Sequence, residues 1–116
     1  MRAFAVAFWL ALIAPAALAQ TAVAPSEAPK HLGETVTVEG AVDEVHTDAR
    51  SGVTFINLGG RFPNQALTCV IFRDDAPKFP NVDELPGHVV RITGKVQNYK
   101  GRVEIICNDA GQLKIK

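Results

Sequence analysis

Few residues in this sequence combine in a spacing that could perform catalysis or bind a metal. The three histidines, His31, His46 and His88, lie far apart, and none has a partner histidine or cysteine at zinc-site spacing. The neighbouring carboxylates Asp74-Asp75 and Asp83-Glu84 flank a proline-rich segment, so we interpret them as solvated or capping residues. No phosphate-binding P-loop, nucleophile elbow or zinc-protease motif occurs. We therefore expect no catalytic residue, no metal ligand and no cofactor.

The first 19 residues have the layout of a secretory signal peptide. Arg2 provides the positive charge, Ala3–Ala14 is an apolar run of 12 residues, and Ala17-Leu18-Ala19 is an A-x-A cleavage signal. The run is shorter than the roughly 20 apolar residues that span a bilayer, although an uncleaved anchor is the alternative. We expect cleavage before Gln20, a periplasmic or secreted protein, and no membrane span in the mature chain.

The remaining residues 20–116 have the size and charge of one small domain. Without Arg2 they carry 11 basic and 12 acidic side chains, which excludes a strongly basic nucleic-acid clamp. Residues 20–30 are rich in alanine and proline and show no hydrophobic period, so they predict a flexible arm. Residues 31–116 then form the domain, which we expect to be a monomer.

Five segments of this domain show the period-two pattern of β-strands: residues 35–45, 53–58, 67–72, 88–97 and 103–108. Gly40 and Gly94 lie inside the first and fourth segments, where glycine permits the sharp bend of a strand in a closed barrel. Asp74–Pro86 contains three prolines and can form only one or two helical turns. The pattern predicts an all-β, five-stranded Greek-key OB-fold barrel with a short helical connection between strands 3 and 4; a half sandwich is the alternative.

The sequence over about His31–Lys114 resembles OB-fold domains of the anticodon-binding type, as found in small secreted bacterial proteins. The resemblance rests on Leu32-Gly33, Val36-x-Val38-x-Gly40-x-Val42, Phe55-Ile56-Asn57-Leu58, Leu85-x-Gly87-x-x-Val90-x-Ile92-x-Gly94-x-Val96 and Tyr99-x-Gly101-x-x-Glu104-Ile105. It implies that Phe55 faces outward and stacks on a base. This sequence has His46 where the family commonly has an arginine, and Thr68 where it commonly has a glutamine.

OB barrels usually bind ligands on the face of strands 2 and 3, beside the first and last loops. The expected ligand-binding residues on and around this face are His46, Arg50, Phe55, Asn57, Thr68, Phe72, Lys100 and Arg102. Aromatic side chains stack on bases and cations follow the phosphates, so these residues could form a single-strand site. The alternative is that Phe72 packs against the helical connection and the cations are ordinary solvated loop residues.

Cys69 and Cys107 are the two cysteines of the chain. Cys69 shares a strand face with Leu67 and Ile71, and Cys107 shares one with Val103 and Ile105. Strands 3 and 5 are neighbours in an OB-fold, so both thiols would point into the barrel. An oxidising compartment then favours a disulfide, with two buried free thiols as the alternative.

These observations favour a secreted, non-catalytic binding module. The resemblance implies a single-stranded nucleic acid or nucleotide as the ligand, bound around Phe55. The nearly neutral charge and the small number of aromatic residues instead favour an envelope or stress-related adaptor that binds a protein or a small ligand.

Overall fold

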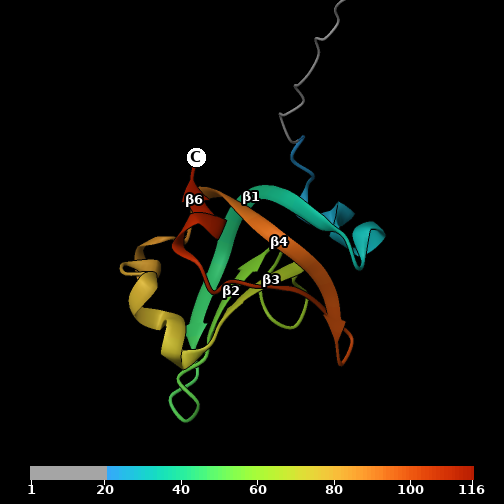
Figure 1. Cartoon of the computed structure of the whole chain (residues 1–116). Coiled ribbons are helices and arrows are strands. Elements are labelled where there is room, and N and C mark those ends of the chain that lie inside the picture. Colours follow the sequence, from blue (N-terminus) through green and yellow to red (C-terminus); the bar gives the residue numbers. More distant parts are fainter. Residues whose placement is uncertain (1–20) are drawn as a thin grey trace, which may run out of the picture.

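The computed structural model describes residues 21–116, so the predicted signal peptide lies outside the described residues. Figure 1 shows a curved sheet with short 3-10 helices at its edges. The strands are β1 (Thr35–Thr47), β2 (Thr54–Leu58), β3 (Leu67–Ile71), β4 (Val89–Tyr99), β5 (Arg102–Ile106) and β6 (Leu113–Ile115). The 3-10 helices are η2 (Pro25–His31), η3 (Arg73–Lys78), η4 (Val82–Glu84) and η5 (Ala110–Gln112).

The first five strands close into a barrel. They follow the order β1-β2-β3-β5-β4, and an additional pairing of β1 with β4 completes the ring. β3 and β5 run parallel, whereas the other neighbours in the ring run antiparallel. The predicted five-stranded Greek-key barrel is confirmed, and its closure excludes the half sandwich. η3 and η4 form the predicted helical connection between strands 3 and 4.

Strand β1 takes part in both regions of the barrel because it bends in the middle. Its first half pairs with β4 from Thr35 to Ala41, and its second half pairs with β2 from Val42 onward. The register shifts between Val42 and Glu44, which marks a β-bulge. A Cβ at Gly40 would lie 2.5 Å from Cγ of Pro25, so glycine permits the close approach of the N-terminal segment.

The described part of the N-terminal segment packs on the barrel in place of the expected flexible arm. Val23 forms a parallel bridge with Val38 of β1. The backbone of Val23 accepts from Glu39 and donates to Thr37. Ala28 of η2 is fully buried among the core residues. Composition alone missed this contact because Val23 and Ala28 lie in a stretch rich in alanine and proline, without the periodicity that marks a regular element.

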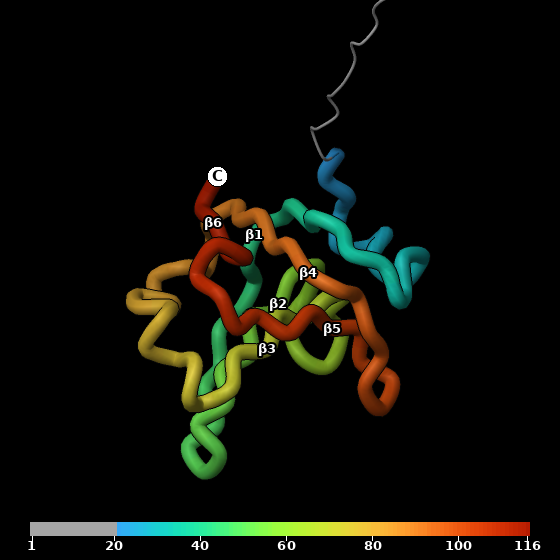
Figure 2. The backbone as a smooth tube through the Cα atoms, viewed as in Figure 1, coloured from blue at the N-terminus to red at the C-terminus, as the bar shows by residue number. Residues whose placement is uncertain are grey.

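The tube in Figure 2 shows β4 and β5 joined by a tight hairpin. Tyr99 pairs with Arg102, so Lys100 and Gly101 form a two-residue loop. Both residues have positive φ angles, 51° and 83°, as a type I′ turn requires. Asn98 supports the turn because its side-chain oxygen accepts from the Gly101 amide. This hairpin places Arg102 at the start of β5.

The C-terminal residues add a sixth strand that the sequence pattern does not predict. A capping box begins η5: the Asp109 side chain accepts from the Gly111 amide, and the Gln112 side chain accepts from the Asp109 amide. Gln112 also donates to the carbonyls of Thr93 and Ile106. These contacts direct β6 onto the edge of β4.

The interior of the barrel is filled by aliphatic side chains from all five strands. Ile56, Leu58, Ile92 and Ile105 are fully buried there. Residues of the connection cover one end of the barrel, with Phe79 7% and Leu85 5% exposed. Among residues 21–116, no helix has the length and hydropathy needed to cross a membrane.

Candidate functional site

A pocket of about 420 Å³ lies on the face of β2 and β3 that is opposite the barrel interior. Its size falls within the range of small-ligand sites. The lining residues come from β1, β2, β3, β5 and the β2–β3 loop: Glu44, His46, Phe55, Asn57, Phe62, Gln65, Thr68 and Arg102.

Aromatic rings form one side of this pocket. His46 and Phe55 are directly opposite each other on β1 and β2. Their ring centroids are 6.4 Å apart and their planes differ by 13°, so the two rings lie nearly parallel. The Arg102 guanidinium lies over the Phe55 ring at 5.2 Å from its centroid, and 5.9 Å from that of Tyr99. A flat ligand that stacks on Phe55 therefore shares this surface with a cation.

Arg102 is held in place by a buried carboxylate. Its Nε donates to Glu104 at 3.1 Å, and Gln97 donates to the other carboxylate oxygen at 3.2 Å. Glu104 is 4% exposed and lies on the same sheet face as Thr68, its partner on β3. Within residues 21–116, the Nη groups of Arg102 have no hydrogen-bond partner. They can therefore donate to an anionic ligand at the mouth of the pocket.

The floor of the pocket is a chain of four polar side chains. Gln65 Nε2 donates to Thr68, the Thr68 hydroxyl donates to Asn57, and Asn57 Nδ2 donates to Glu44. The Phe62 backbone amide and Asn57 Nδ2 hold the pKa of Glu44 below its usual range, and Arg61 contributes further. Glu44 is therefore ionised at neutral pH and accepts hydrogen bonds without donating any.

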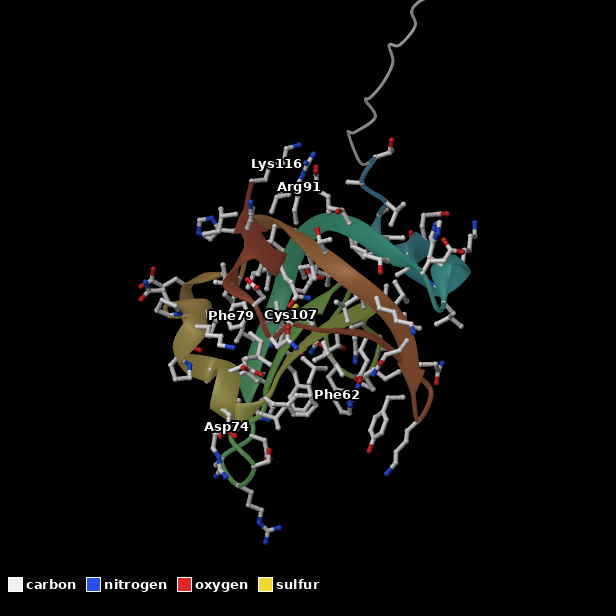
Figure 3. The ribbon with its side chains drawn as sticks, in the orientation of Figure 1. Phe62, Asp74, Phe79, Arg91, Cys107 and Lys116 are labelled. Carbon is white, nitrogen blue, oxygen red and sulfur yellow. The ribbon has the colours of Figure 1, made fainter. Side chains whose placement is uncertain are left out.

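The loop between β2 and β3 is attached to β1 by two carboxylates. The Gly60 amide donates to Asp43 at 2.7 Å, and the Phe62 amide donates to Glu44 at 2.9 Å. These bonds hold Phe62 at the pocket although its side chain is 66% exposed (Figure 3). An exposed large aromatic held by its backbone is available to contact a ligand.

A second pocket, of about 430 Å³, adjoins the first. Phe62, Gln65 and Arg102 line both, and Tyr99 and Lys100 of the β4–β5 hairpin line the second. Lys100 Nζ lies 5.4 Å from the Tyr99 ring centroid. The two pockets share these three residues, and we call them together the groove, which runs from β1 to the hairpin.

The structure brings some of the predicted site residues together and leaves others apart. His46, Phe55, Asn57, Thr68 and Arg102 line the first pocket. Lys100 lines the second. Arg50, in the β1–β2 loop, and Phe72, at the start of η3, line neither pocket.

Three residues of the pocket were missed by the sequence reasoning: Glu44, Phe62 and Gln65. Glu44 shares its strand face with His46, so strand periodicity could have identified it. Phe62 and Gln65 lie in a loop without periodicity, and the one signal was a phenylalanine next to Pro63 and two residues after Gly60.

The two cysteines lie inside the barrel, as Figure 3 shows for Cys107. Cys69 lies in β3, and Cys107 directly follows β5, the neighbouring parallel strand. Their sulfur atoms are 2.7 Å apart, and both residues are free thiols. Both residues are fully buried. The adjacent Cys107 thiol and burial raise the pKa of the Cys69 thiol. In residues 21–116 no group of three or more histidine, cysteine or acidic side chains could hold a metal ion.

A closed five-stranded barrel with a ligand pocket on the β2–β3 face defines the class of OB-fold binding domains. The chain belongs to the tRNA anti-codon family, described as an OB-fold nucleic acid binding domain, whose model matches residues 36–113. No curated protein matches the sequence.

Solved structures with the same fold include proteins of two kinds. The OBody AM1L10, bound to hen egg-white lysozyme, is 24% identical with a TM-score of 0.61, and the match covers 88% of this chain and 98% of the OBody. The aspartyl-tRNA synthetase of Entamoeba histolytica is 16% identical, with a TM-score of 0.58 over 83% of this chain. The asparaginyl-tRNA synthetase of the same organism is 19% identical, with a TM-score of 0.53 over 84% of this chain. The matched region is 21% and 24% of those synthetases, so the chain corresponds to about a quarter or less of their length.

Proposed function

We propose that this protein is a non-catalytic module that binds single-stranded nucleic acid in the groove around Phe55. The observation that carries the proposal is the pocket on the β2–β3 face, in which parallel aromatic rings lie beside a guanidinium with unpaired Nη groups. An aromatic ring supports a stacked base, and the guanidinium donates to a phosphate. The family to which the chain belongs supports this choice of ligand.

The balance of charge limits the strength of this binding. Two carboxylates of the site, Glu44 and Glu104, are paired with Arg61 and Arg102, so they do not present free negative charge. Lys100 adds one cation in the adjoining pocket. Because so few cations are available, we expect weak binding that depends on stacking as well as on charge.

Fluorescence anisotropy with a labelled single strand of about 12 nucleotides tests the proposal. Phe55→Ala should lose roughly 1–3 kcal/mol of binding free energy with the salt dependence unchanged. Phe72→Ala is the matched control, because Phe72 is also partly exposed but lines neither pocket. Lys100→Ala should instead reduce the slope of affinity against salt by about one unit, whereas Lys114→Ala, on β6, should not.

Both pocket variants should keep the wild-type melting temperature within a few degrees, since neither side chain belongs to the barrel core. Binding by the wild type should be detectable at low salt and weaken as salt increases. No binding at protein concentrations near about 100 μM would reject nucleic acid as the ligand. Equal losses in the Phe55 and Phe72 variants would reject the pocket as the site.

A protein adaptor is the second candidate. The chain carries equal numbers of basic and acidic residues, which gives no long-range attraction to a polyanion. The OBody with the same fold is described as bound to lysozyme, so a protein ligand is compatible with an OB barrel. A stable complex with a protein, formed by a chain that binds no oligonucleotide, would favour this candidate.

We further propose that the protein is exported, by cleavage after Ala19, and that Cys69 and Cys107 then form a disulfide. The apolar run and the A-x-A signal of residues 1–19 support export. The facing thiols support the bond, because no other cysteine competes for either partner. Such a bond would stabilise the barrel between β3 and the end of β5, beneath the proposed binding face.

A further inference from the structure

The outer side of the wall formed by β1, β4 and β6 carries a cluster of cations. Glu39 of β1 pairs with Arg91 of β4, and Arg91 pairs with Lys114 of β6, so these side chains form one row across the strands. Side chains alternate along a strand, so Lys95 of β4 and Lys116, directly after β6, lie on the same side. We call these residues and the threonines between them the basic face: Thr35, Thr37, Glu39, Arg91, Thr93, Lys95, Lys114 and Lys116.

The cations of the basic face are exposed and keep donors that the folded chain does not use. The Arg91 and Lys116 side chains are 49% and 56% exposed, and Figure 3 shows them close together at one end of the barrel. Each donates to the Glu39 carboxylate at 2.8 Å. Arg91 uses only Nε for this contact, and within residues 21–116 its Nη groups have no hydrogen-bond partner. Lys95 and Lys114 are exposed, and in the same part of the chain neither forms a hydrogen bond or an ion pair.

The basic face concentrates positive charge in a chain whose total charge is nearly neutral. It holds four of the 11 basic side chains of residues 20–116 and one of the 12 acidic ones. Hydrogen bonds from Lys116 and Arg91 hold the pKa of that carboxyl, Glu39, below its usual range, so it is ionised and offsets one cation. Seven basic and 11 acidic side chains lie elsewhere in the domain. The face is therefore positive while the rest of the domain is negative, and this separation of charge orients the molecule toward an anionic surface.

A hollow of about 310 Å³ in the basic face has the lining of an anion site. Arg91 and Lys114 line it from neighbouring strands, together with Thr93 and Gly111. Among the described residues that line this hollow there is no carboxylate. A phosphate group in the hollow can therefore accept from the guanidinium and the ammonium together.

We infer that the basic face binds the surface of a membrane rich in anionic lipids such as phosphatidylglycerol. Clusters of lysine and arginine are attracted to the negative potential of such a surface, whose phosphates are spread over an area rather than along a line. The basic face includes no aromatic ring for a base to stack on, and it shares no residue with the groove. A single strand of nucleic acid therefore fits the groove better than this face.

The apolar run of residues 3–14 joins the described structure beside the basic face. Residues 22–24 line a hollow of about 440 Å³ together with Arg91 and Lys116. The run ends eight residues before Ala22, which corresponds to at most about 28 Å of extended chain. In a precursor whose apolar run lies in the bilayer, the barrel stays within reach of the lipid headgroups, and the basic face is next to the tether. Cleavage after residue 19 would add the positive charge of a new amino terminus at the same place.

Co-sedimentation with lipid vesicles tests the inference. The chain from Gln20 onward is used, because it contains the whole barrel without the apolar run, which would itself insert into a bilayer. We expect it to sediment with vesicles of phosphatidylglycerol and phosphatidylcholine in equal parts, and not with vesicles of phosphatidylcholine alone. Raising the salt concentration to about 0.15 M should weaken the binding, because the Debye length then falls to about 8 Å.

Lys95→Gln/Lys114→Gln removes two exposed cations without a partner among residues 21–116, so the melting temperature should stay at the wild-type value. This variant should bind the anionic vesicles about 25-fold more weakly, since each cation near such a surface strengthens binding about fivefold. Arg50→Gln/Arg73→Gln is the matched control, because it makes the same change of charge at two exposed residues of the β1–β2 loop and η3. It should stay within about twofold of the wild type, since these positions lie outside the basic face.

The outcomes are distinct from those that test the groove. Equal sedimentation with both kinds of vesicle, or none with either at low salt, would overturn membrane binding and leave single-strand binding in place. Equal losses in the two double variants would overturn the basic face as the contact. If Lys95→Gln/Lys114→Gln lost affinity for the labelled single strand as strongly as for the vesicles, the face would be a nucleic-acid contact and the inference would be wrong.

Discussion

Reduction of the proposed bond between Cys69 and Cys107 should destabilise the barrel strongly. The two residues are 38 positions apart, so the bond closes a loop of that length in the unfolded chain. In the chain-entropy model this corresponds to about 4 kcal/mol at 25 °C. A domain of this size shifts its melting temperature by about 4–8 °C per kcal/mol, so we expect a decrease of roughly 15–30 °C.

Circular dichroism melting of the exported protein, with and without a phosphine reductant, measures this shift. The Cys69→Ala/Cys107→Ala variant is the control, because its melting temperature should not respond to the reductant. Thiols must be counted in denaturant, since burial and the raised pKa of Cys69 suppress alkylation of the folded protein. Two titratable thiols in the denatured, unreduced protein would refute the bond. Equal melting temperatures with and without reductant would refute the calculated stabilisation.

Three further predictions concern export, packing and acid stability. The intact mass of protein recovered from the periplasm or medium should correspond to a chain that begins after Ala19; a species that retains residues 1–19 would contradict export. Gly94→Ala should destabilise the barrel by about 1–3 kcal/mol in denaturant titration, because the new Cβ would lie 2.5 Å from Ile105 Cγ2. Gly111→Ala meets its nearest neighbour at 3.5 Å and should have a much smaller effect. The pKa of Glu44 is lowered by folding, so its contribution to stability is present above the carboxyl pKa of the unfolded chain and is lost as pH falls from about 5 to 3. Glu44→Gln should show a weaker decrease in melting temperature over this pH range than the wild type, and an identical decrease would contradict the role of this carboxylate.

The sequence was sufficient to predict the barrel because each strand carries its own hydrophobic period. Alternation of apolar residues marks the face of a strand that must be buried, and the mid-strand glycines mark where β1 and β4 bend. The same local patterns missed η2 and β6, because their stability comes from contacts with β1 and β4 rather than from their own periodicity.

The sequence by itself also determined which outward-facing side chains lie on strands β1, β2 and β3, among them His46, Phe55 and Thr68. Only the tertiary structure decided which of the loop residues join them. Phe62 and Gln65 reach the pocket because Asp43 and Glu44, 17 and 18 positions before their amide partners, hold the β2–β3 loop. The Glu44 carboxylate can only accept, so it determines which atom donates in each hydrogen bond on the pocket floor, from Asn57 through Thr68 to Gln65. That direction depends on atoms from three chain segments in contact, and a local sequence pattern carries no information about such contacts.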